Sequence, residues 1–281
     1  MRRSLLRALR AVAATSLVAV TILSCDRAKT MSLDSIGQEI GLADPAPRPP
    51  LVVDVLCDRS DGASCTATTL RETFHAILPV VAGRSDSVVR GWMLGDDLAT
   101  TALVGEQRAP SRTDGQSDRA IAAARDRFTA TAEPYFAKAF ESRFTTEPVR
   151  CTVLAEGITR IALTGAPRDA LHVIVVVTDA WEVSRFADFE CRDMPDAASF
   201  TRAIQRERVL AAGSLNGARV MFVYVELRPI RRPGCAVTPA RALAARDVWT
   251  MALKSAGARD VTFSTGALDV EALTAGEEAH R

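Results

Sequence analysis

Cysteine and histidine are the residue types that most readily bind metals or attack substrates, and both are scattered along this sequence. The cysteines, Cys25, Cys57, Cys65, Cys151, Cys191 and Cys235, include no CxxC pair, so their spacing indicates neither a zinc ribbon nor a thioredoxin-like site. The histidines, His75, His172 and His280, lack the spacing of a metal-binding motif. The sequence has no GxSxG, HExxH, GxxxxGK[ST] or GxGxxG motif. We therefore predict that the protein is not an enzyme.

Composition and charge narrow the class of protein further. Of the 281 residues, 48% are apolar and 25% are charged, which is typical of a globular chain with a sizeable core. The 35 basic residues almost balance the 34 acidic ones, so the formal net charge is only +1. Because so small a charge does not attract phosphates over a distance, we predict no nucleic-acid partner.

The N-terminus has the order of charged and apolar residues that is typical of an export signal. Arginines at positions 2, 3, 7 and 10 precede an uncharged, mostly apolar stretch over residues 11–24, which is too short to span a bilayer. It ends in Ile22-Leu23-Ser24-Cys25, which resembles the lipobox of bacterial lipoproteins. That resemblance implies a signal peptide over residues 1–24 and a lipidated Cys25 that anchors the mature protein. The alternative is an ordinary signal peptide with an incidental cysteine.

The residues that follow suggest a location and a domain plan. Asp26 resembles the retention signal of lipoproteins that stay at the inner membrane, so we expect the protein on the periplasmic face of that membrane. Prolines gather near the end of residues 25–50 and favour an extended spacer. We predict one folded domain over residues 51–268 and a C-terminal tail over residues 269–281.

Apolar segments after residue 50 predict an α/β sheet. The segment 172–178 is apolar without alternation, as expected of a strand that helices cover on both faces. Gly95-Asp96-Asp97 separates two apolar runs and predicts an antiparallel hairpin, and Pro134 predicts two helices or one kinked helix over residues 117–144. The expected strands are 51–57, 87–94, 98–104, 172–178, 219–227 and 260–264, and the expected helices are 66–81, 117–144, 153–163, 197–212 and 239–256. This order predicts a doubly wound, mostly parallel, Rossmann-like sheet with one antiparallel edge strand and helices on both faces.

Several of these features together resemble a von Willebrand factor type A domain. They are the strand followed by Asp58-Arg59-Ser60-Asp61-Gly62, the hairpin, the strand that leads into Asp179, and Trp249 followed by Ser255-Ala256-Gly257-Ala258. The resemblance covers residues 51–268. It implies the doubly wound fold predicted above, and a protein-binding function through loops at the carboxyl ends of the strands.

The resemblance also implies a metal site. In that family a metal-ion-dependent adhesion site takes Asp-x-Ser-x-Ser after the first strand, a threonine from a second loop and an aspartate after the fourth strand. The matching residues are Asp58, Ser60, Thr152 and Asp179, with Thr113 as the competitor of Thr152, and oxygen ligands of this kind suit Mg²⁺ or Mn²⁺.

The match to that site is incomplete. Gly62 stands where the family has its second serine, so the site is degenerate unless Ser64 replaces it. The alternative is that the same aspartates, serine and threonine only cap turns and helix ends, with no metal nearby.

The predicted fold also gives roles to Trp181 and to the cysteines. Trp181 lies just after Asp179, where an exposed ring would anchor a partner. Because an oxidising compartment favours disulfides, we predict a Cys191–Cys235 bond and a second bond drawn from Cys57, Cys65 and Cys151. Lipidation of Cys25 leaves an odd number of cysteines, so at least one stays free or pairs between molecules.

The sequence therefore predicts a membrane-anchored module that binds another envelope protein. One alternative is a metal-independent structural scaffold that makes contacts through its helix faces. Another is a metal-dependent hydrolase that uses Asp58 and Asp179.

Overall fold

The computed structural model describes residues 48–60, 65–144, 151–225 and 238–275. They belong to one compact unit, Arg48–Arg281. The predicted signal peptide, Cys25 and most of the proline-rich spacer lie outside the described residues. Within the ranges just given, every helix is too short or too polar to cross a membrane.

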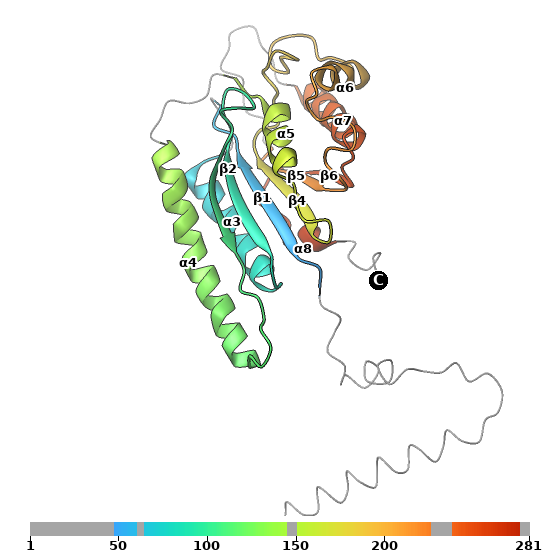
Figure 1. Cartoon of the computed structure of the whole chain (residues 1–281). Helices are drawn as coiled ribbons and strands as arrows, with labels where there is room; N and C mark the ends of the chain where they lie inside the picture. The colour runs from blue at the N-terminus through green and yellow to red at the C-terminus, as the bar shows by residue number, and fades with distance from the viewer. Residues whose placement is uncertain (1–47, 61–64, 145–150, 226–237, 276–281) are drawn as a thin grey trace, which may run out of the picture. The chain divides into compact units, whose positions relative to one another are not determined.

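In the described residues, six strands form one sheet in the order β3-β2-β1-β4-β5-β6 (Figure 1). All neighbouring strands run parallel except β2 and β3, which pair antiparallel at one edge. The predicted fold class is therefore confirmed. The strands are β1 (Leu51–Cys57), β2 (Val88–Met93), β3 (Ala102–Arg108), β4 (Leu171–Val177), β5 (Arg219–Val223) and β6 (Asp260–Phe263).

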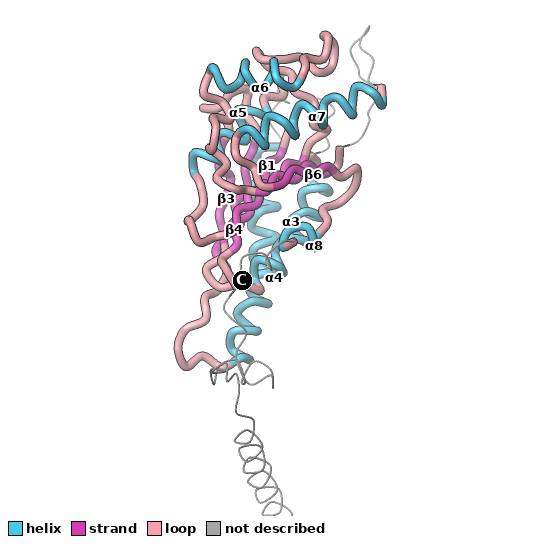
Figure 2. The backbone as a smooth tube through the Cα atoms, turned by 90° about the vertical axis from the view of Figure 1, so that its right-hand side faces the viewer, coloured by secondary structure: helices cyan, strands magenta, loops and turns pink. Residues whose placement is uncertain are grey.

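Helices cover both faces of the sheet, and each face has its own core. Alternate residues of a strand point to opposite faces, so Val53 and Val55 join the core beneath α3, α4 and α8, whereas Leu56 joins the core beneath α5, α6 and α7. Figure 2 shows α3, α4 and α8 together on one side of the strands. The helices are α3 (Ala67–Ala82), α4 (Asp118–Phe144), α5 (Leu154–Thr164), α6 (Ala197–Arg206), α7 (Pro239–Ser255) and α8 (Val270–Thr274).

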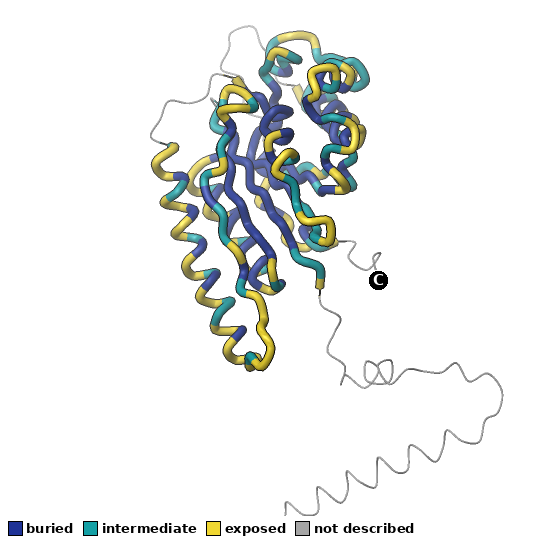
Figure 3. Tube along the Cα trace, in the orientation of Figure 1, coloured by how far each residue is buried: buried dark blue, intermediate teal, exposed yellow. Residues whose placement is uncertain are grey.

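The central strands are buried because both of their faces are covered (Figure 3). Every residue of β1 is buried, and so are the last five residues of β4. This burial explains why both strands are almost continuously apolar instead of alternating. Asp54 is the exception in β1.

Several predicted boundaries were wrong, each for a local reason. The strand expected at residues 98–104 begins at Ala102, because Asp97 accepts hydrogen bonds from the amide and hydroxyl of Thr100 and holds residues 97–101 in a turn. The helix expected over 197–212 ends at Arg206, before Arg208, whose φ of 60° is left-handed. The strand expected over 219–227 ends at Val223, before Tyr224, whose φ is also 60°.

Pro134 does not divide the helix, since α4 is one α-helix from Asp118 to Phe144. Pro134 is exposed, so water can bond the carbonyl group that loses its helical donor. Buried side chains at helical spacing on both sides of Pro134 hold α4 against α3, and Phe136 stacks on Phe74 with ring centroids 4.3 Å apart.

The fold also extends beyond residue 268, into the predicted tail. Leu273 of α8 is only 1% exposed and joins the core beneath α3. Arg219 of β5 donates to the carbonyl oxygen of Ala272 at 2.6 Å and also to that of Ala275. The short helix α8 therefore belongs to the domain.

A buried carboxylate joins three adjacent strands, β2, β1 and β4. Asp54 is fully buried, and its two oxygens accept hydrogen bonds from Arg90 Nε and Nη2, each at 2.7 Å. Trp92 Nε1 donates at 2.6 Å, and His172 Nε2 lies 2.7 Å from Asp54 Oδ2. Because a buried carboxylate is stable only when it is paired and fully hydrogen-bonded, these contacts fix how the strands align.

We expect the Arg90→Met substitution to lower the free energy of unfolding by about 3–5 kcal/mol, because it leaves the Asp54 carboxylate buried without its cation. Chemical denaturation measures this change. The matched control is Arg108→Met, which breaks the exposed Arg108–Glu106 pair and should change the free energy of unfolding by less than about 1 kcal/mol. Equal effects of the two substitutions would contradict the prediction.

Candidate functional site

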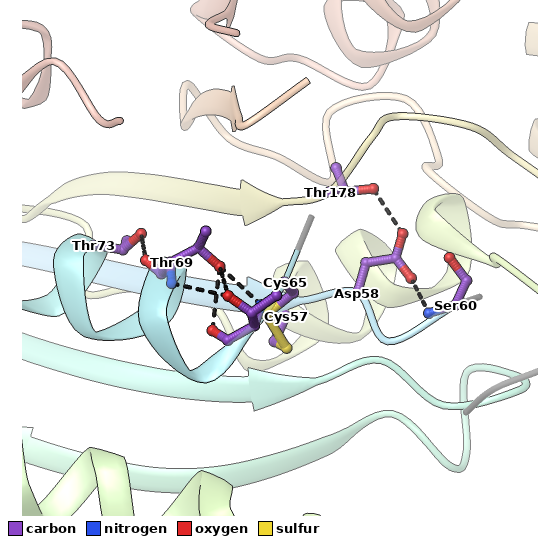
Figure 4. Close-up of a disulfide and its surroundings, with 8 residues drawn as sticks. Cys57, Asp58, Ser60, Cys65, Thr69, Thr73 and Thr178 are labelled. Atoms are coloured by element: carbon purple, nitrogen blue, oxygen red, sulfur yellow. Dashed lines mark hydrogen bonds between the residues drawn. A yellow bond between two sulfur atoms is a disulfide. The ribbon is translucent and has the colours of Figure 1, made fainter. Parts of the chain in front are cut away.

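The loops after β1 and β4 meet at the carboxyl edge of the sheet. Strands β1 and β4 pair so that Cys57 lies opposite Val177, which places Asp58 beside Thr178. The Thr178 hydroxyl donates to Asp58 Oδ2 at 2.7 Å, and the Ser60 amide donates to Asp58 Oδ1 at 2.9 Å (Figure 4). The tertiary structure therefore brings Asp58, Ser60 and the end of β4 together.

The Asp58 side chain is buried at this edge and bonded within the protein. It is 0% exposed, and both of its oxygens accept a hydrogen bond. Burial raises the pKa of the Asp58 carboxyl, while hydrogen bonds from Ser60 and Thr178 oppose that rise. This carboxyl therefore shapes the loop around it.

Asp179 directs its carboxylate into its own loop. Its Oδ1 accepts a hydrogen bond from the Trp181 amide at 3.2 Å, across Ala180, whose φ of 67° makes the sharp turn. Asp179 and Trp181 line a cavity of about 240 Å³ between this loop and α7.

Trp181 itself is buried, at 5% exposure, within the core beneath α7. The prediction of an exposed aromatic anchor at this position was therefore wrong. The turn at Ala180 directs the ring inward, where apolar packing stabilises it more than solvent would.

The two candidate threonines lie at opposite edges of the sheet. The Thr152 carbonyl oxygen accepts a hydrogen bond from the Val183 amide at 2.9 Å, so Thr152 lies beside the loop that follows β4. Thr113 follows β3, which runs antiparallel to β2, and the nearby Ser111 hydroxyl bonds Asp86 at 2.5 Å, just before β2 begins. Thr113 therefore lies at the amino edge and away from Asp58.

A buried carboxyl group that the sequence analysis missed is Glu182, three residues after Asp179. Its Oε2 accepts a hydrogen bond from the Ala155 amide at 3.3 Å, at the start of α5. Val153, the N-cap residue of α5, supplies no side-chain hydrogen bond to the helix, so Glu182 performs that role from a distant part of the chain. The one sequence signal that could have indicated this is the apolar Val153 at the start of α5, since a helix that begins with such a residue needs a hydrogen-bond acceptor from elsewhere in the chain.

Burial raises the pKa of Glu182 to about 8, and repulsion from Glu156 adds to this rise. Glu182 Oε1 has no hydrogen-bond partner among the described residues. At neutral pH the carboxyl therefore stays mostly protonated, which avoids a buried unpaired charge.

In the part of the chain that the structure describes, the side chains at this edge do not form a complete ligand set for Mg²⁺. Mg²⁺ requires near-octahedral oxygen ligands, yet Asp58 and Asp179 both accept hydrogen bonds from their own loops, and position 62 is a glycine without a side-chain oxygen. Among the described residues, no three His, Cys, Asp or Glu side chains are grouped so as to hold a metal ion. Gly62 and Ser64 lie outside the described residues.

The structure identifies one of the disulfide pairings that the sequence left open. Cys57 and Cys65 form a disulfide that closes the loop carrying Asp58 and Ser60 (Figure 4), and Cys151 is free and exposed. Cys191 is also in a disulfide. Its predicted partner, Cys235, lies outside the described residues.

No protein-family profile matches the sequence, and no curated protein matches it. Among solved structures, an aerotolerance-related membrane protein from Bacteroides fragilis is 13% identical, with 82% of this chain and 99% of that chain covered and a TM-score of 0.37. The PilB minor pilin from Streptococcus sanguinis is 12% identical, with 85% and 62% covered and a TM-score of 0.41. A von Willebrand factor type A structure from Catenulispora acidiphila, from the family that the sequence resembles, is 15% identical, with 74% and 43% covered and a TM-score of 0.27. These TM-scores are low, so the fold class rests on strand order and helix layers.

The buried Glu182 carboxyl gives folding stability a defined pH dependence. Its pKa is raised from 4.5 in the unfolded chain to about 8 in the folded protein. The stability that the folded protein gains from keeping this carboxyl protonated is therefore fully present below pH 4.5 and is lost as pH rises through about 8. We expect Glu182→Gln to remove this loss and to be more stable than wild type at pH 9 by about 3–5 kcal/mol. Chemical denaturation between pH 4.5 and 9 measures the free energy of unfolding of both proteins, and Glu141→Gln, at an exposed position, is the control. Parallel profiles of wild type and Glu182→Gln would contradict the assignment.

We expect the paired substitution Cys57→Ala with Cys65→Ala to lower the free energy of unfolding by about 2–3 kcal/mol, because the disulfide restricts a short loop in the unfolded chain. Cys151→Ala removes an exposed free thiol and serves as the matched control, with an expected change within about 0.5 kcal/mol. A loss no larger than that of the control would show that the bond adds nothing to the loop.

Proposed function

We propose that this protein is a lipid-anchored module of the bacterial envelope that binds another envelope protein through the loops at the carboxyl edge of its sheet. The observation that carries the proposal is the convergence of the loops after β1 and β4, joined by the Asp58–Thr178 hydrogen bond. In doubly wound sheets, ligands bind at this edge. The lipobox-like sequence ending in Cys25 supports the anchor.

Metal independence is part of the proposal. The Asp58 and Asp179 carboxylates each accept a hydrogen bond from an amide of their own loop, which supports loops shaped by contacts within the chain. The partner would therefore contact exposed side chains around the edge, and would not complete the coordination of Mg²⁺ or Mn²⁺.

A structural scaffold that uses its helix faces is the second candidate. The observation that favours it is a pair of exposed apolar side chains on α7, Leu243 at 59% and Met251 at 45% exposure. They lie about two turns apart on one helix, so a partner could cover both.

Site-specific photo-crosslinking from the full chain in its own membrane separates these proposals. A photoreactive residue at Thr68, exposed at the start of α3 beside the end of β1, should crosslink an envelope protein, and the yield should be the same in excess chelator. The same residue at Arg127, on the exposed side of α4, is the control and should give no product.

The other outcomes each overturn a part of the proposal. Crosslinked products from a photoreactive residue at Met251, but not from one at Thr68, would favour the scaffold. Loss of the Thr68 product in chelator would overturn the metal independence, and equal products from Thr68 and Arg127 would contradict the assignment of the carboxyl edge.

A further inference from the structure

A larger cavity lies at the same carboxyl edge, beside α5. Its volume is about 710 Å³, within the range of about 300–1,000 Å³ that is typical of ligand pockets. Its lining comes from residues 96–99 after β2, from the start and outer side of α5, from residues 183–185 after β4 and from residues 207–209 after α6. We call this cavity the α5 pocket.

One side of the α5 pocket is apolar. Val153 and Val209 are buried in its wall, and Leu163 of α5 is 67% exposed at its border. An exposed leucine beside a concave apolar wall is a surface that a partner's aliphatic side chain can cover.

The other side of the pocket carries excess negative charge. Glu156, with its side chain only 7% exposed, pairs with Arg185 at 3.1 Å and also accepts a hydrogen bond from the Leu98 amide at 2.8 Å. Arg185 is therefore neutralised within the chain. Three further carboxylates, Asp96, Asp97 and Glu207, then face a single arginine, Arg208, in the lining.

The carboxylates at the border are accessible. Hydrogen bonds from Thr100 lower the pKa of Asp97, so it stays ionised at neutral pH. Asp96 and Glu207 are exposed, and the side-chain carboxylate of each has no hydrogen bond or ion pair with another residue in the part of the chain that the structure describes.

We propose that the α5 pocket binds a cationic segment of the partner protein, in which an arginine or lysine stands next to an aliphatic residue. The cation faces Asp96 and Glu207, and the aliphatic group covers Leu163 and Val209. The Glu156–Arg185 pair shows the same recognition inside the chain, since a guanidinium from an exposed loop reaches a buried carboxylate. This inference rests on the proposed function, because it specifies the chemistry of the partner.

Capped tetrapeptides test the chemistry of the α5 pocket on the full chain in detergent. Gly-Arg-Leu-Gly should bind at least about fivefold more tightly than Gly-Gln-Leu-Gly, and more weakly as salt rises from about 0.05 to 0.5 M, because exposed charges are screened. Gly-Glu-Leu-Gly should not bind. Titration followed by amide NMR shifts of Ala99 and Val183 measures each affinity.

The variant for this test is Asp96→Asn with Glu207→Gln, which should abolish the preference for arginine. The matched control, Asp114→Asn with Glu141→Gln, removes two exposed carboxylates away from the pocket and should keep it. If the pocket variant retains the preference, or if the glutamate peptide binds as tightly as the arginine peptide, the inference is wrong.

Crosslinking distinguishes failure of this inference from failure of the proposed function. With the photoreactive residue at Thr68, the pocket variant should lose most of the crosslinked partner that wild type captures. If wild type and pocket variant capture it equally, the proposed function stands and the pocket inference is wrong. If wild type captures nothing, the proposed function is wrong, and the peptide titration still decides whether the pocket binds cations.

Discussion

The buried Asp54 carboxylate limits how the central strands can align, and the carboxyl edge of the sheet depends on that alignment. Its oxygens accept hydrogen bonds from Arg90 and Trp92 of β2 and from His172 of β4. A shift of one residue in any of these strands would turn the polar side chains to the opposite face and leave a buried charge without partners. In the register that satisfies Asp54, the end of β1 lies beside the end of β4. The loop carrying Asp58 and the loop carrying Asp179 therefore begin side by side.

The acidic side chains at this edge are held by hydrogen bonds within the chain. Asp58 is bonded by Thr178, Asp179 by the amide of its own loop, and Glu182 by the start of α5. Burial raises the pKa of both Asp58 and Glu182, because it penalises the charged form of a carboxyl group. These carboxyl groups position the loops, and in the proposed function a partner contacts the exposed side chains around them.

The two faces of the sheet differ in what their helices do. On one face, the long helix α4 packs through aromatic side chains such as Phe136 against Phe74 of α3, and this layer is structural. On the other face, α5 is short, begins with a cap supplied by a distant glutamate, and borders the pocket of about 710 Å³. The proposed binding chemistry therefore belongs to the face where the helices leave room at the carboxyl edge.

The amino-acid pattern predicts the order of strands and helices along the chain, the antiparallel edge pair and the edge at which Asp58 and Asp179 lie. These follow from local patterns, because apolar runs and turn residues act over a few positions. Tertiary packing alone establishes that Cys57 pairs with Cys65 and leaves Cys151 free, that Trp181 points inward, and that Glu182 caps α5. Only it revealed the Asp54 cluster and the α5 pocket. Such features join side chains that are far apart in the chain, as with Asp54 and His172, 118 positions apart. No local pattern encodes which distant residue will stand opposite, since that depends on how whole strands and helices pack.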